Sequence, residues 1–173
     1  MIESDLIEET ISRALSTGGE FAEVFAEDKR SSSALLDDGK VEELSSGCDR
    51  GAGIRVVVGE TTGFAHTADL SEQGLRQAAE AAAAAARSAG AGTVVAALSE
   101  VDAPAPNPVE VLPETVAKAT KVALLNRADE VARSEGASIK QVSARYADSR
   151  RRILVANSDG VLATDDQVKT LFS

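Results

Sequence analysis

The chain has 173 residues, which suits one domain or one domain with a long internal excursion. Hydrophobic residues make up 43% of it but aromatic residues only 3%, so we expect a core of Ala, Val, Leu and Ile. The formal net charge of -10 argues against a nucleic-acid-binding surface, which requires clustered Lys and Arg. Cys48 is the only cysteine, which excludes an intramolecular disulfide and a cysteine-based zinc site.

The sequence predicts neither a signal peptide nor a membrane span. Residues 1–5 lack the basic region and apolar core of a signal peptide. Every apolar stretch falls short of the roughly 20 residues that cross a bilayer. We therefore expect a cytoplasmic protein that binds neither membrane nor nucleic acid.

The N-terminal residues predict a helix followed by a strand. Ser4 is placed to cap the helix, and Gly18 with Gly19 to end it. Between them, apolar residues recur at the spacing of one helix face: Ile7, Ile11, Ala14 and Leu15. Residues 21–28 then alternate as a strand, with Ala22, Val24 and Ala26 on one face.

Two predicted turns indicate β-hairpins after the first helix. The first helix and the strands that follow it together occupy residues 4–67. Asp38 and Gly39 lie between the strand-like residues 31–36 and 41–46, and Gly accepts the positive φ of a type I′ turn. Gly59 and Glu60 join a second pair of strands, residues 51–58 and 61–67.

Two further helices follow, separated by a crossover. Ser71 caps the first, residues 71–89, and Leu70 with Leu75 forms a hydrophobic staple. The Gly- and Pro-rich residues 90–113 predict a surface crossover. Pro113 begins the next helix, residues 113–135. Its predicted apolar stripe comprises Val116, Ala119, Ala123, Ala128 and Val131.

A second meander is predicted over residues 139–173. Residues 139–148 and 151–156 form its first hairpin, with the basic run around Arg150 as a solvated turn. The residues Asn157-Ser158-Asp159-Gly160 then turn the chain into a last strand, residues 161–172. Because the chain stops inside this strand, we expect a longer parent protein. The predicted fold class is α+β: antiparallel β-meanders packed with about three helices, forming a single domain over residues 1–173.

Side chains that carry catalysis are sparse. His66 is the only histidine, whereas a zinc peptidase site needs at least two, or one with suitably spaced carboxylates, so we expect His66 to be a rim or capping residue. Gly51 and Gly53 precede a strand, which favours close backbone approach over dinucleotide binding. Cys48 is expected to be inert beside Gly47 and Asp49.

Paired acidic residues predict solvated faces and turns: Glu8-Glu9, Asp37-Asp38, Glu42-Glu43 and Asp165-Asp166. We therefore predict no catalytic, cofactor-binding or metal-ligating residue in this chain.

Several segments form a distributed pattern: Gly51-Ala52-Gly53-Ile54-Arg55, Gly63-Phe64-Ala65 and Thr67-Ala68-Asp69-Leu70-Ser71. The pattern continues in Ala22-Glu23-Val24-Phe25 and in Ile153-Leu154-Val155-Ala156-Asn157-Ser158-Asp159-Gly160. These segments resemble the TldD/PmbA family, once called modulators of DNA gyrase and now regarded as zinc metallopeptidases, and the last of them favours the TldD side of the family. The family's His-Glu-x-x-x-His metal motif does not occur in this sequence.

The resemblance implies the N-terminal scaffold domain of a zinc metallopeptidase that hydrolyses short or unfolded peptides. Zinc would then be bound in a C-terminal part beyond Ser173, and this fragment would be inactive. The partner would be a TldE/PmbA-like subunit or a second copy. Arg55 and the backbone of residues 51–53 would have structural roles. The alternative is a non-catalytic module that binds a peptide or a partner subunit.

Overall fold

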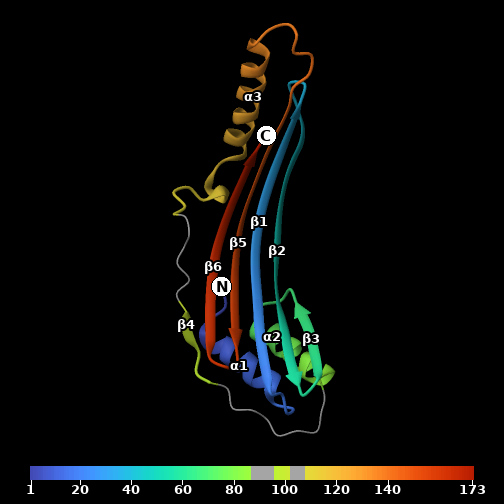
Figure 1. Cartoon of the computed structure of the whole chain (residues 1–173), viewed down its shortest axis with the longest axis vertical. Coiled ribbons are helices and arrows are strands. Elements are labelled where there is room, and N and C mark those ends of the chain that lie inside the picture. Colours follow the sequence, from blue (N-terminus) through green and yellow to red (C-terminus); the bar gives the residue numbers. More distant parts are fainter. Residues whose placement is uncertain (87–95, 102–107) are drawn as a thin grey trace. The chain divides into compact units, whose positions relative to one another are not determined.

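The computed structural model describes residues 1–86, 96–101 and 108–173. Its strands form one six-stranded sheet with the order β3-β2-β1-β5-β6-β4 (Figure 1). In chain order the elements are α1 (Ser4–Leu15), β1 (Phe21–Asp37), β2 (Lys40–Val58), β3 (Thr61–Thr67), α2 (Glu72–Ala85), β4 (Ser99–Val101), the 3-10 helix η1 (Pro113–Thr115), α3 (Lys118–Ser134), β5 (Ser143–Asn157) and β6 (Val161–Phe172). The predicted α+β class is confirmed. Among the described residues, each helix is too short or too polar to span a bilayer.

The described residues divide into two compact units. Unit 1 comprises those within 1–28, 50–105 and 152–165, and unit 2 those within 29–49, 106–151 and 166–173. Strands β1, β2, β5 and β6 therefore supply residues to both units.

Several turns adopt the predicted conformations. Asp38 and Gly39 between β1 and β2 have φ values of 47° and 77°, the positive pair that a type I′ turn requires. Gly59 between β2 and β3 has a φ of 56°. The β1 and β2 strands are longer than predicted, because residues 21–28 and 31–36 lie in one strand and residues 41–46 and 51–58 in another. The intervening polar residues of β1 and β2 continue the strands instead of forming loops.

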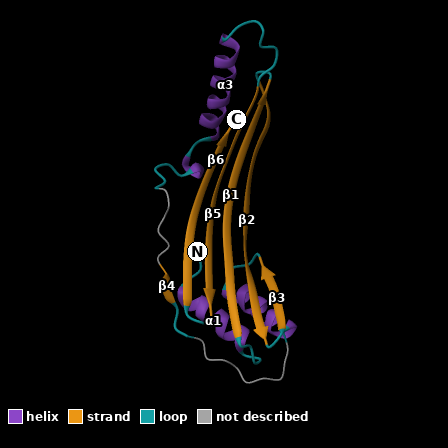
Figure 2. Cartoon of the chain, in the orientation of Figure 1, coloured by secondary structure: helices purple, strands orange, loops and turns teal. Residues whose placement is uncertain are grey.

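The core of unit 1 consists of aliphatic side chains, as predicted. Figure 2 shows α1 and α2 in purple against the orange strands. The largest side chains that are fully buried there come from α1, β1, β2 and α2: Ile7, Ile11, Leu15, Val24, Ile54, Val56 and Leu75. The prediction that Ser4 caps α1 is wrong, because Glu3 occupies the N-cap position without a side-chain hydrogen bond. Ser4 is the first helical residue instead.

The segment before α2 is a hydrogen-bonded helix start. The Thr67 hydroxyl accepts from the Asp69 amide at 3.0 Å, and the Asp69 carboxylate accepts from the Ser71 amide at 2.9 Å. Ser71 then caps α2 as predicted, because its hydroxyl accepts from the Gly74 amide at 3.3 Å. The backbone hydrogen bond from Ser71 is the main cause that lowers the pKa of Asp69. This motif therefore determines where α2 begins.

The turn between β5 and β6 is pinned to β1 within unit 1. The Asn157 side-chain oxygen accepts from the amides of Asp159 and Val161, each at 3.1 Å. Buried Ser158 exchanges two hydrogen bonds with Ala22: its amide donates to the Ala22 carbonyl at 2.8 Å, and its hydroxyl accepts from the Ala22 amide at 3.1 Å. The predicted turn is confirmed, and it also joins β5 to β1.

The predicted helix over residues 113–135 is wrong at its start and in its buried face. Pro113 opens η1, and Val116 and Ala117 are extended, with ψ values of 123° and 140°, before α3 begins at Lys118. The buried residues of α3 are Lys121, Leu125 and Asp129. Three members of the predicted apolar stripe, Ala119, Ala123 and Val131, are exposed. The predicted apolar stripe is not the buried face of α3, because that face contains two polar residues, Lys121 and Asp129, which are buried as partners in ion pairs.

The predicted turn around Arg150 is also wrong. Residues 149–152 lie inside β5, which is one continuous strand that begins at Ser143. Carboxylates distant in sequence pair with the basic side chains: Arg150 contacts Glu114 at 2.6 Å, and Arg152 contacts Asp28 at 2.8 Å. A basic run remains in a strand here because its charges are paired across neighbouring segments.

The predicted crossover lies partly outside the described residues, since residues 87–95 and 102–107 are not described. The described part contains β4, a strand that the sequence did not predict. It pairs with β6 in parallel, with Ser99 opposite Val161, whereas β2 and β3 pair antiparallel.

A substitution at Gly63 in β3 tests how closely α2 packs on the sheet. A Cβ at this position would lie 2.6 Å from the Ala86 backbone nitrogen and 2.8 Å from its Cβ. We expect Gly63→Ala to lower the free energy of unfolding by about 1–3 kcal/mol through overpacking. Urea denaturation measures the loss. The control Thr62→Ala, at an exposed position of the same strand, should change it by less than about 0.5 kcal/mol. Equal effects of both substitutions would contradict the close packing.

Candidate functional site

Unit 2 contains a cavity of about 530 Å³. Residues of β1 and β2 form part of its lining, Arg30 to Ser32 and Ser46 to Cys48. Pro113, Glu114 and Val116 precede α3, and the first turn of that helix contributes Lys118 and Lys121. Asp148 and Arg150 of β5 complete the lining. The volume is within the range of about 300–1,000 Å³ that is typical of small-ligand sites.

A buried ion pair joins α3 to β5 at this cavity. Lys121 Nζ lies 2.5 Å from Asp148 Oδ2, and their side chains are only 6% and 4% exposed. Lys121 also donates to Ser32 Oγ at 2.8 Å, and Ser32 Oγ donates to Asp148 Oδ1 at 2.8 Å. A buried ion pair is stable only when further hydrogen bonds satisfy its polar atoms, and Ser32 contributes to that here.

Two opposing effects act on the Asp148 carboxyl. Burial is the largest single influence and raises its pKa, but hydrogen bonds from Lys121, Ser32 and Tyr146 together outweigh it. The pKa of Asp148 is therefore lowered below its ordinary value. Burial, together with the hydrogen bond to Asp148, raises the pKa of Tyr146 to about 12. Asp148 is thus held ionised and Tyr146 neutral near pH 7.

Arg150 connects three segments of unit 2. Its guanidinium contacts Glu114 at 2.6 Å and Asp166 of β6 at 2.5 Å. The hydrogen bond to Asp166 is the main cause that raises the pKa of Arg150, followed by the one to Glu114. Burial raises the pKa of Glu114, but the contact with Arg150 and weaker effects outweigh it and the net shift is downward. This network positions η1 beside the sheet.

The side chains considered from sequence do not form a metal site. His66 is exposed in β3, and its ring stacks on Phe64 with 6.3 Å between the ring centroids. Within residues 1–86, 96–101 and 108–173, no three His, Cys, Asp or Glu side chains are grouped as metal ligands. The described residues therefore do not fit a zinc ion.

Gly51 and Gly53 show the close backbone approach that the sequence predicted. A Cβ on Gly51 would lie 2.8 Å from the Thr67 carbonyl oxygen, and one on Gly53 would lie 3.0 Å from the Phe64 ring. Arg55 Nε contacts Glu23 Oε1 at 2.8 Å, and the guanidinium lies 5.8 Å from the centroid of the Phe21 ring. These contacts join β2 to its neighbours β3 and β1.

Most residues of the acidic pairs are exposed, as predicted, and several of them also pair with basic or amide side chains. Asp38 pairs with Arg133 of α3 at 2.5 Å, Asp37 accepts from Gln141 at 3.0 Å, and Asp166 pairs with Arg150. Glu42 and Glu43 are exposed, as predicted.

Sequence reasoning missed the cavity. Gly47 and Asp49 flank Cys48 in the sequence, whereas the fold places it in the same lining as Arg30, Lys118 and Lys121. The unusual pattern of Lys121, Leu125 and Asp129 at four-residue spacing is the signal that would have identified a polar buried face on α3.

The lowered pKa of Asp148 predicts a specific acid dependence of stability. An Asp with a depressed folded pKa contributes stability that is fully present above its unfolded pKa of about 3.9 and is lost as the pH falls through the folded value. We expect Asp148→Asn to make the free energy of unfolding fall less steeply than in the wild type between about pH 5 and pH 2. Urea denaturation at several pH values measures the slope. The control Asp49→Asn, at an exposed site, should keep the wild-type slope. A wild-type slope in Asp148→Asn would contradict the pKa assignment.

Two family models match the chain in sequence. "PmbA/TldA metallopeptidase domain 1" matches residues 22–86, and "PmbA/TldA metallopeptidase central domain" matches residues 112–173. The chain is 31% identical over 147 residues to a metalloprotease TldD homolog of Haemophilus influenzae, which covers 84% of this chain and 30% of that protein. It is 29% identical over 167 residues to a metalloprotease TldD homolog of Buchnera aphidicola, and the match covers 96% of this chain and 34% of that protein. The chain thus spans about one third of the length of these relatives.

Solved structures share the fold. TldE from Thermococcus kodakarensis superimposes with a TM-score of 0.73 at 17% identity, covering 96% of this chain and 38% of that one. A protein from Thermotoga maritima, described as a proposed modulator of a DNA gyrase, gives a TM-score of 0.72 at 14% identity. The match covers 97% of this chain and 38% of that one. The two matched domains follow one another in chain order, and the relatives bear the same family name. The chain therefore belongs to the TldD/PmbA metallopeptidase family.

Proposed function

We propose that this chain is the N-terminal scaffold portion of a TldD-type zinc metallopeptidase that hydrolyses short or unfolded peptides. The observation that carries the proposal is the succession of two metallopeptidase domains, domain 1 and the central domain, over a chain that covers about one third of its relatives. Catalysis would belong to residues outside this chain. Its own contribution would be structural, through the sheet and the ion-pair network of unit 2.

The chemistry of the residues supports a non-catalytic role. A zinc peptidase needs protein ligands for the metal and a general base beside the bound water, which the metal activates as the nucleophile. His66 is the only histidine and lies beside Phe64 on an exposed face of β3. Asp148, the most deeply buried carboxylate of the cavity, is already paired with Lys121.

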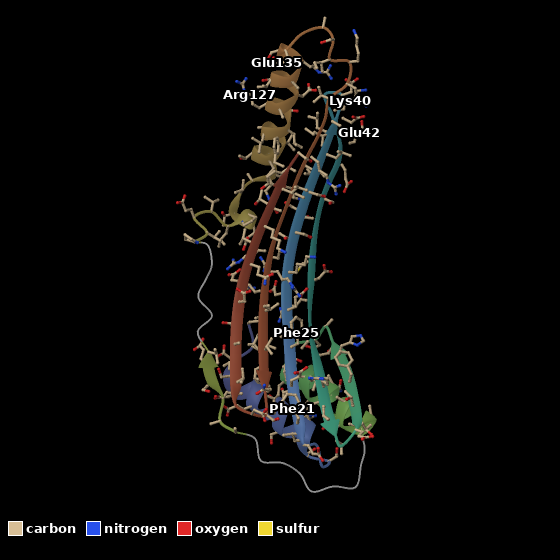
Figure 3. The ribbon with its side chains drawn as sticks, in the orientation of Figure 1. Phe21, Phe25, Lys40, Glu42, Arg127 and Glu135 are labelled. Carbon is tan, nitrogen blue, oxygen red and sulfur yellow. The ribbon has the colours of Figure 1, made fainter. Side chains whose placement is uncertain are left out.

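An alternative is a module that binds a peptide or a TldE/PmbA-like subunit without catalysis. The favouring observation is the edge of β2 in unit 2. Pairing with β3 begins at Ala52, and residues 41–49 of β2, which belong to unit 2, are all exposed. An exposed edge accepts an added strand through main-chain hydrogen bonds. Lys40 and Glu42, labelled in Figure 3, place charges on this strand that would limit unspecific association.

Metal analysis and peptide hydrolysis test the proposal. We expect the 173-residue chain to bind no stoichiometric zinc and to hydrolyse no unfolded casein. We expect its full-length parent to do both, with activity lost on chelation. His66→Ala in the parent should leave zinc content and activity unchanged, because His66 is not a ligand in this account.

Zinc and chelator-sensitive hydrolysis in the 173-residue chain would contradict the scaffold role. Absence of metal and activity from the parent as well would overturn the peptidase proposal and favour the binding module. Elemental mass spectrometry and a fluorescent casein assay supply the two readouts.

A further inference from the structure

We propose that the free edge of β2 in unit 2 binds an extended, basic segment of an unfolded polypeptide, which joins the sheet as an additional strand. The proposal rests on the second function proposed above, a module that binds a peptide. It specifies where the peptide binds and which charge it carries. We call residues 41–49 of β2 the β2 edge.

The β2 edge is part of a strand but has a neighbouring strand on one side only. In the sheet order β2 lies between β3 and β1, and its pairing with β3 begins at Ala52 (Figure 1). Among the described residues, the outward N–H and C=O groups of the β2 edge therefore have no strand to pair with. An extended peptide satisfies such groups through main-chain hydrogen bonds. The backbone thus selects the conformation of the ligand.

The side chains of the β2 edge leave it open to an added strand. Native proteins protect free edges with proline, with a covering segment or with charge. The β2 edge contains no proline, and all of its residues are exposed. Its apolar side chains, Val41 and Leu44, are 42% and 46% exposed. Charge is therefore the property that selects among the strands that could bind.

The charged residues of the β2 edge are all acidic. They are Glu42, Glu43 and Asp49, and the edge contains no Lys or Arg. In the part of the chain that the structure describes, no ion pair engages these three carboxylates. Opposite charges on facing positions of paired strands attract, and like charges repel. A strand rich in Lys and Arg is therefore favoured, and an acidic strand is disfavoured.

Cations lie near the β2 edge but not on it. Lys40 and Arg50 flank the edge, and Lys118 of α3 donates to Ser46 Oγ at 3.3 Å. The charged positions that an added strand faces directly are therefore the carboxylates, and directly facing residues make the closest cross-strand pairs. Two β2 edges from two copies of the chain would place carboxylates on both strands. Charge thus favours a basic peptide over self-association.

Amide hydrogen exchange, measured by NMR, tests strand addition in the 173-residue chain. The probe is the peptide Lys-Thr-Lys-Val-Lys-Thr-Lys-Val-Lys at constant ionic strength. We expect it to slow exchange at alternate residues of the β2 edge, because alternate amides of a strand point toward the same neighbour. A variant with Pro-Pro at its centre should protect less, since proline has no N–H.

Two results of the exchange experiment would overturn the proposal. One is unchanged exchange of the β2 edge at saturating peptide, which would mean that the peptide forms no main-chain hydrogen bonds there. The other is protection that appears without peptide and increases with protein concentration, which would identify a second copy of the chain as the occupant.

Glu43→Lys tests the selection by charge. We expect it to weaken binding of the basic peptide by about fivefold, because a repulsive cross-strand pair replaces an attractive one. The same substitution should strengthen binding of the counterpart peptide with Glu in place of Lys. The matched control Glu135→Lys makes the same change of net charge at the exposed C-cap of α3 and should leave both affinities within about twofold of the wild type. Isothermal titration calorimetry measures the affinities.

Equal effects of Glu43→Lys and Glu135→Lys, or equal affinities of the wild type for the basic and acidic peptides, would overturn the proposal. These measurements involve neither zinc nor hydrolysis. Failure of the basic peptide to bind would leave the peptidase proposal standing, and a parent without zinc or activity would leave peptide binding at the β2 edge standing.

Discussion

The ion pair between Lys121 and Asp148 is the contact on which unit 2 depends. The apolar core of that unit is small, since among the described residues its buried cluster consists of Ala34, Leu36, Leu125 and Ala144. So few side chains provide a limited hydrophobic contribution to the docking of α3. A buried pair costs desolvation energy, and that cost is offset only where the geometry is good and the remaining polar atoms are hydrogen-bonded. Ser32 contributes to this requirement, since its hydroxyl accepts from Lys121 Nζ and donates to Asp148 Oδ1. The position of α3, and with it one wall of the cavity, therefore follows from charge pairing.

Unit 1 is stabilised differently. Its core joins two helices to the strands through aliphatic side chains, and alanines such as Ala79 and Ala82 bring α2 close to β3. Gly63 permits this approach, since any side chain would collide with Ala86. Hydrogen-bonded turns at Ser71 and Ser158 determine where the elements begin and join. The family motifs noted in the sequence contain Gly63, Ser71 and Ser158. The close packing at Gly63 and the hydrogen-bonded turns at the two serines explain these motifs structurally, without a catalytic role.

Features that depend on neighbouring residues could be predicted from the sequence. The type I′ turn at Asp38, the cap at Ser71 and the aliphatic core each follow from local conformational preference or from alternation. Features that depend on distant partners could not. Arg150 remains inside a strand because Glu114 and Asp166 pair with it, and α3 buries Lys121 because Asp148 lies opposite. The cavity was missed for the same reason, since its lining comes from five separate segments.

A double-mutant cycle on Lys121 and Asp148 tests the dependence of unit 2 on charge pairing most directly. The variants are Lys121→Met, Asp148→Leu and the double substitution, each measured by urea denaturation. Each single change leaves one buried charge without its partner, and the double change removes both charges. We predict that the decreases in the free energy of unfolding caused by the two single substitutions add up to more than the decrease caused by the double substitution. The difference, the coupling energy, should be about 1–3 kcal/mol. A cycle on the exposed pair Arg127 and Glu130, 3.5 Å apart on the same helix, should give about 0.5 kcal/mol or less. A coupling near zero for Lys121 and Asp148 would contradict the account.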